Sequence, residues 1–181
     1  MTKLQNLYLA NSPITYDNIA TDWEDATSEY AKQYADEELS WSNLKDLTDV
    51  ELYNCPKLTQ IPEFVYDLPE LQLLNVACNK GISADQLTAD WKRLADDEDT
   101  GPKVQILYLG YNNLEKFPES ESLRKMVKLG LLDCVHNNVN HLEAFGTDVK
   151  LSDLMLSYNQ IEEIPDEFCA FTDQVEGLGF S

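Results

Sequence analysis

Acidic side chains are the most abundant groups in this sequence that could take part in chemistry. The run from Asp96 to Asp99 concentrates carboxylates, which are the ligands that calcium prefers. This run lacks the alternating ligand spacing of an EF-hand loop, and no bidentate glutamate follows it at the required distance. We therefore interpret it as the solvated end of a helix.

Cysteine and histidine offer a second kind of chemistry, namely metal binding or nucleophilic catalysis. Three of the four cysteines fall at positions that should be buried, and the fourth, Cys78, stands beside a turn. No C-x-x-C pair occurs, and only His136 and His141 could complete a metal site. The sequence therefore predicts no metal site and no cofactor, and it does not support a disulfide framework.

Motifs of catalysis are also missing from the sequence. There is no Gly-rich phosphate loop, no G-x-S-x-G nucleophile elbow, and no cysteine with a histidine at a matching position. We expect the chain not to be an enzyme by itself.

The charge of the chain excludes two classes of partner. Its 181 residues carry 13 Lys and Arg against 33 Asp and Glu, a formal net charge of −20. Such a surface repels nucleic acid and anionic membranes. No apolar run reaches the length of a membrane span, so we expect no membrane insertion. The hydrophobic content of 43% is enough for the core of one domain.

The elements that position these side chains recur along the chain. The copies approximate the pattern L-x-x-L-x-L-x-x-N/C-x-L, although the first has Ser12 at the ninth position and the last is truncated. The alternating leucines indicate a short strand with one buried face. Most copies begin 22 to 25 residues apart, and two longer spacings indicate insertions at about 15–43 and 83–102, each with a helix of one apolar face. The copies begin at Leu4, Leu47, Leu71, Val104, Leu129, Leu151 and Val175.

This pattern resembles the leucine-rich repeat, and the resemblance covers nearly the whole chain. It implies an α/β fold: a solenoid or horseshoe segment with a parallel β-sheet on the concave face and helices or 3₁₀ segments on the convex face. Residues 1–181 then form a single domain of about six repeats and a truncated seventh.

The ninth position of each repeat forms a column that the pattern predicts to be buried. An asparagine there turns the chain and satisfies backbone groups of the adjacent coil, and cysteine is the usual alternative. We interpret this column as structural rather than functional. Its members are Cys55, Asn79, Asn112, Asn137 and Asn159.

The outward positions of the strands and the following turn are the expected binding surface. Apolar and aromatic residues gather there in the middle and later repeats, which is typical of a recognition surface, although they could also serve only cross-strand packing. No Lys or Arg occupies these positions, so the partner should be neutral or basic. The predicted contacts are Leu73, Ile106, Tyr108, Tyr111, Leu131, His136, Met155 and Tyr158.

The function that the sequence favours is recognition of a protein or peptide on the concave surface. The convex Ile-Pro segments, such as Ile61-Pro62, resemble those of bacterial surface or secreted repeat proteins, which implies an extracellular or cell-surface location. Two alternatives stay open: a targeting arm of a larger enzyme of the effector-ligase type, and a carbohydrate-binding surface protein. Because both ends lack a polar cap, we expect a fragment of a longer protein, or self-association through the ends.

Overall fold

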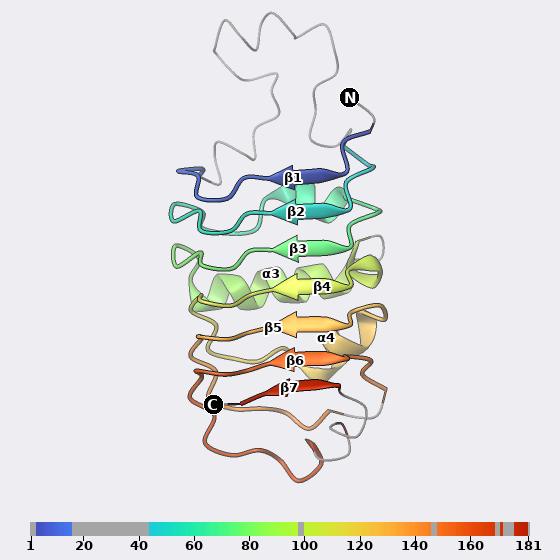
Figure 1. Cartoon of the computed structure of the whole chain (residues 1–181). Helices are drawn as coiled ribbons and strands as arrows, with labels where there is room; N and C mark the ends of the chain where they lie inside the picture. The colour runs from blue at the N-terminus through green and yellow to red at the C-terminus, as the bar shows by residue number, and fades with distance from the viewer. Residues whose placement is uncertain are drawn as a thin grey trace, which may run out of the picture.

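The computed structural model describes residues 3–15, 44–97, 100–145, 148–168, 171 and 176–180. Within these residues the chain forms one seven-stranded parallel sheet whose strands follow one another in chain order (Figure 1). No described helix is long and apolar enough to cross a membrane. The strands are β1 (Asn6–Tyr8), β2 (Asp49–Glu51), β3 (Leu73–Asn75), β4 (Ile106–Tyr108), β5 (Leu131–Asp133), β6 (Asp153–Met155) and β7 (Gly177–Gly179).

Strand register confirms the repeat alignment residue by residue. Each strand is three residues long, and its middle residue pairs with the middle residue of the next strand. Since side chains alternate across a strand, the middle residue points into the solenoid and its two neighbours point to the other face. The middle residues of β2 to β6 are buried: Val50, Leu74, Leu107, Leu132 and Leu154.

Helical segments cover the convex side, as the repeat pattern predicts. Figure 1 shows the long helix α3 behind β4, with the shorter α4 farther along the solenoid. Pro62 caps the first convex segment, where its fixed φ suits the start of a helical turn. The elements are η3 (Glu63–Asp67), α3 (Ala84–Asp96), η4 (Gly101–Lys103) and α4 (Ser120–Lys125).

Helix α3 lies within the predicted second insertion and begins at a side-chain cap. Ser83 Oγ accepts a hydrogen bond from the backbone N–H of Gln86 at 3.2 Å. Its apolar stripe of Leu87, Trp91 and Leu94 is buried against the coils. The first predicted insertion helix lies outside the described residues.

A buried carboxylate ties α3 to the preceding coil. Asp90 is 4% exposed, and its Oδ2 accepts from the Ile61 N–H at 2.9 Å while its Oδ1 accepts from Gln86 Nε2 at 2.7 Å. Burial raises the pKa of this carboxyl group, and the hydrogen bonds to its charged form act in the opposite direction. Nearby, Arg93 forms a bidentate pair with Glu63 at 2.7 and 2.6 Å. These contacts hold the insertion in one place on the convex wall.

The asparagine column lies inside the solenoid and links successive coils. Asn112 Oδ1 accepts from the Asn79 N–H at 2.6 Å, and its Nδ2 donates to the carbonyls of Val76 and Leu109, both at 3.0 Å. Asn79, Asn137 and Asn159 make corresponding bonds to the preceding coil, where their Oδ1 atoms accept from the N–H groups of Cys55, Leu114 and Val139 in turn. Their Nδ2 groups donate to backbone carbonyls of two coils. Asn159 is half-buried, whereas the other asparagines and Cys55 are buried. Each asparagine therefore satisfies backbone groups that the turn would otherwise leave unpaired.

Candidate recognition surface

Two rows of residues face away from the core on the strand face of the sheet, and only the glycines of β7 carry no side chain there. Their members lie opposite one another on neighbouring strands, about 4.8 Å apart. The first row is Asn6, Asp49, Leu73, Ile106, Leu131, Asp153 and Gly177. The second row is Tyr8, Glu51, Asn75, Tyr108, Asp133, Met155 and Gly179.

Apolar side chains occupy the centre of the first row. Leu73, Ile106 and Leu131 come from three consecutive strands and are paired in register, and each is half-buried. They do not belong to the buried core cluster of the described residues. The structure therefore places these three predicted contacts side by side in one apolar strip.

Tyr108 and Met155 lie in the second row, with Asp133 between them. Asp133 Oδ1 accepts from the backbone N–H of Val135 at 2.9 Å, which fixes the carboxylate at the end of its strand. Partial burial raises the pKa of Asp133, whereas this hydrogen bond and the nearby His136 act to lower it. Polar and acidic residues therefore interrupt the second row, which is not continuously apolar.

Beyond the ends of β4 to β6, three aromatic rings form a continuous stack that we call the aromatic ladder: Tyr111, His136 and Tyr158. The ring centroids of Tyr111 and His136 are 4.2 Å apart with an interplanar angle of 19°. Those of His136 and Tyr158 are 4.1 Å apart at 12°. The tyrosines are 45% and 61% exposed, so the stack forms a raised aromatic border along the strand face.

The backbone beneath the aromatic ladder is held in the left-handed region. Tyr111, His136 and Tyr158 have φ values of 57°, 51° and 59°, which are unfavourable for bulky side chains. The Tyr111 N–H donates to the Val135 carbonyl at 2.8 Å, so hydrogen bonding between coils enforces this conformation. Asn11, Asn54 and Cys78 occupy the same position in the earlier coils, also with positive φ.

Repeat alignment identifies this column, but stacking across it does not follow from the pattern. Earlier along the same border, Asn54 Nδ2 donates to Asn11 Oδ1 at 2.8 Å. A hydrogen bond with Cys78 raises the pKa of Tyr53, which places a further phenol beside the border. Tyr53 is not among the predicted contacts, and its position holds Ala77 and Gly110 in the next two coils.

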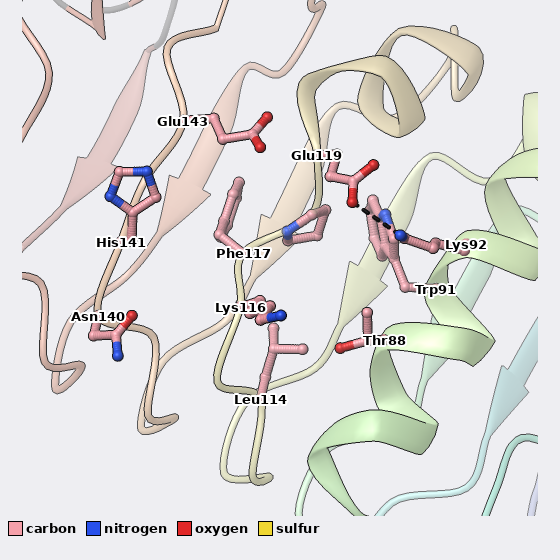
Figure 2. Close-up of a pocket in the computed structure, with 11 residues that line it drawn as sticks. Thr88, Trp91, Lys92, Leu114, Lys116, Phe117, Glu119, Asn140, His141 and Glu143 are labelled. Carbon is pink, nitrogen blue, oxygen red and sulfur yellow. Dashed lines mark ion pairs between the residues drawn. The ribbon is translucent and has the colours of Figure 1, made fainter.

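A separate hollow of about 360 Å³ lies beside α3 (Figure 2). Thr88, Trp91 and Lys92 of α3 form one wall, and Asn140, His141 and Glu143 form the opposite one. Lys92 Nζ pairs with Glu119 Oε1 at 2.8 Å across its rim. Three of its charged groups are engaged, Lys92 with Glu119 and Glu143 with the Ser120 N–H. Its aromatic residues, Trp91 and Phe117, are nearly all buried, so the strand face is the better candidate site. The described residues contain no cluster of three or more metal-ligating side chains.

Comparison with known proteins agrees with this architecture. The family model described as Leucine Rich Repeat matches residues 150–171. A crystal structure of a leucine-rich repeat protein from Bacteroides thetaiotaomicron is 80% identical, with a TM-score of 0.85 over 99% of this chain. The chain belongs to the leucine-rich repeat family. No curated protein matches the sequence.

Two further solved structures share the leucine-rich repeat architecture. A leucine-rich repeat protein from Bacteroides eggerthii is 57% identical with a TM-score of 0.81 over 96% of this chain. The plant peptide hormone receptor RGFR1, solved in complex with RGF2, shares the fold at 17% identity and a TM-score of 0.55 over 99% of this chain and 28% of its own. The present chain spans 22% and 28% of the two Bacteroides proteins, so it corresponds to roughly a quarter of their length.

Proposed function

We propose that this leucine-rich repeat chain is a non-catalytic recognition module that binds a peptide or protein on its strand face. The fold is a typical protein-interaction module. The observation that carries the proposal is the aromatic ladder, whose bulky residues occupy left-handed positions. Glycine or asparagine would suit those positions better, so strain held at a surface site is best explained by a use for the side chains.

The stacking geometry favours a peptide over a carbohydrate. A sugar binds an aromatic residue through the face of the ring, and here His136 has both faces covered by Tyr111 and Tyr158 at 4.2 and 4.1 Å. Apart from the outer faces of Tyr111 and Tyr158, the ladder presents ring edges, phenol groups and imidazole nitrogens. Such groups suit the amides and side chains of a peptide lying along the border.

The charge of the strand face favours a neutral or basic partner. Asp49, Glu51, Asp133 and Asp153 lie on its two rows, and no Lys or Arg lies on its seven described strands. A basic partner would be attracted and oriented by this field, whereas an acidic one would be repelled.

A displayed library of random dodecapeptides tests this proposal. We expect peptides selected on the wild-type chain to lose binding to the double variant Tyr111→Ala/Tyr158→Ala by at least about tenfold, because most of the ladder is removed. The matched control is Glu115→Ala/Glu162→Ala, which truncates two exposed residues away from the strand face. Undiminished binding to the ladder variant, with an unchanged circular dichroism spectrum, would place recognition elsewhere.

The setting of the module is part of the same proposal. Its two Bacteroides relatives are much longer bacterial leucine-rich repeat proteins, of which this chain covers 22% and 28%. We infer that the module acts within a larger bacterial protein at the cell surface or after secretion. Antibody labelling of intact cells, compared with permeabilised cells, tests this. Labelling only after permeabilisation would contradict it.

A further inference from the structure

The first row of the strand face has a symmetric chemical order. Strand register places Asp49, Leu73, Ile106, Leu131 and Asp153 in one line across β2 to β6. The line therefore reads acid, three apolar residues, acid. A further acid lies near each end in the second row, since Glu51 follows on β2 and Asp133 lies on β5, the strand next to Asp153, where it pairs with Met155.

Both terminal acids of the row lean away from its apolar centre. With its amide oriented to satisfy its neighbours, Asn6 on β1 donates a hydrogen bond to Asp49. At the other end, a Cβ on Gly177 would collide with Asp153 Oδ1, so this carboxylate lies over β7. The apolar strip is consequently open between two separated negative charges.

Neither end of the row is neutralised by a cation of the chain. Among the ion pairs of the described residues, none involves Asp49, Glu51, Asp133 or Asp153. The cations of those pairs come from α3, α4 and the segment before β4 rather than from the strands. A bound partner can therefore supply the missing positive charges.

The spacing of the two acids matches an extended peptide that crosses the strands. The backbones of Asp49 and Asp153 are four strand intervals apart, which corresponds to about 19 Å. Their carboxylates lean farther outward, so long basic side chains are needed to reach them. Six residues of extended chain cover about 20 Å at roughly 3.3 Å per residue. Because alternate side chains share a face, the first, third, fifth and seventh residues of such a peptide all point to the sheet.

We propose that the ligand of this face is an extended peptide segment with the pattern basic–x–apolar–x–apolar–x–basic. This inference rests on the proposed function and adds the chemistry of the partner. The two basic side chains bind the acids at Asp49 and Asp153. The two apolar side chains between them pack on Leu73, Ile106 and Leu131.

Fluorescence anisotropy with synthetic peptides tests the pattern. The probe is the fluorescein-labelled, end-blocked heptapeptide Arg-Ser-Leu-Ser-Leu-Ser-Arg. Its matched control, Arg-Arg-Leu-Ser-Leu-Ser-Ser, has the same composition and charge but places both arginines at one end. We expect the probe to bind at least about tenfold more tightly than the control, because only the probe reaches both acids.

Variants of the chain test whether Asp49 and Asp153 bind the two basic side chains of the probe peptide. Asp49→Asn and Asp153→Asn should each weaken probe binding about fivefold and leave the single-ended control peptide less affected, whereas Glu115→Gln on an exposed turn should change neither. Equal binding of the two peptides, or unchanged probe binding to both Asp variants, would overturn the pattern.

The same experiment separates this inference from the proposed function. If the heptapeptide does not bind the wild-type chain while library-selected peptides still depend on Tyr111 and Tyr158, the charge pattern is wrong and recognition by the strand face stands. If the selected peptides also bind without those tyrosines, recognition by this face is wrong as well, and the charge pattern falls with it.

Discussion

Two columns of residues run side by side along the solenoid, one position apart in the sequence, and they behave in opposite ways. Asn112 and Asn137 are 4% and 5% exposed, and their amides bond to backbone groups of two coils. Tyr111 and Tyr158 in the other column are 45% and 61% exposed, and their rings contact the neighbouring ring of the same column. The buried inner column stabilises the turn, and the turn places the side chains of the outer column in solvent.

The difference shows how a repeat separates stability from recognition. The buried amide fixes the turn, so the backbone of the outer residue is forced into the left-handed region whatever its side chain is. The outer position is therefore free to vary between coils, here from asparagine through cysteine to tyrosine and histidine, at a modest cost in strain. Recognition can change in this column without loss of the fold.

Removing a member of the inner column should have the largest effect. Asn112→Ala leaves the buried Asn79 N–H without its partner and removes one of the two side-chain hydrogen bonds to each of the Val76 and Leu109 carbonyls. We therefore expect a loss of about 3 kcal/mol in the free energy of unfolding. Urea denaturation followed by circular dichroism measures it. Asn140→Ala, at an exposed position, is the control, and equal costs for both variants would remove the distinction between the columns.

Asp90 is a buried polar residue outside both columns. Replacing it tests whether any buried hydrogen-bonding side chain would give a stability loss like that of Asn112→Ala. Asp90→Ala removes the acceptor for the Ile61 N–H and for Gln86 Nε2, so we expect a loss of about 2 kcal/mol in the same urea assay. Asp85→Ala, an exposed acid on the same helix, should cost much less. A negligible effect at Asp90 would mean that α3 is held by its apolar stripe and the Arg93 pair alone.

In the outer column, a glycine variant should be more stable than the alanine variant, which is the reverse of the usual order. Both Tyr111→Ala and Tyr111→Gly remove the stack on His136, but only glycine adopts φ near 57° without steric cost. We expect the glycine variant to be more stable than the alanine variant by about 1 kcal/mol in urea denaturation. The reverse order would show that the left-handed turn does not persist without the ring.

The smallest expected effect concerns the acid beside the aromatic ladder. Burial raises the folded-state pKa of Asp133 above its ordinary value, so the folded chain holds this proton more tightly than the unfolded chain. Its contribution to stability should therefore increase as the pH falls through the raised pKa, and be complete below about pH 4. The stability of the wild type relative to Asp133→Asn, measured from pH 7 to pH 4, should rise. A rise toward neutral pH instead would indicate a lowered pKa.

The sequence predicts the repeating parts of this molecule well because they obey one spacing rule. Strand register follows from the leucines, and the burial of Leu87, Trp91 and Leu94 follows from helical spacing. The sequence did not predict the side-chain contacts between coils that occur only once along the chain. Nothing in the repeat spacing distinguishes Asp90 from the exposed acids of the chain, and only the position of the Ile61 N–H makes it a buried acceptor.

The candidate site was predicted as a set of positions but not as an arrangement. The pattern places Tyr111, His136 and Tyr158 in one column, yet their stacking depends on side-chain torsions and a left-handed backbone that sequence spacing does not specify. The acids at the two ends of the first row were visible in the sequence. Their separation became meaningful only with the strand register.

The placement of His136 between two tyrosine rings also gives the chain a built-in magnetic probe. Its imidazole protons lie in the shielding regions of both rings, so their proton resonances should shift upfield of those of His141, the other histidine and an exposed one. Any partner that separates the stack would move the His136 signals while those of His141 stay in place. A one-dimensional proton spectrum can thus report on the aromatic ladder without a label.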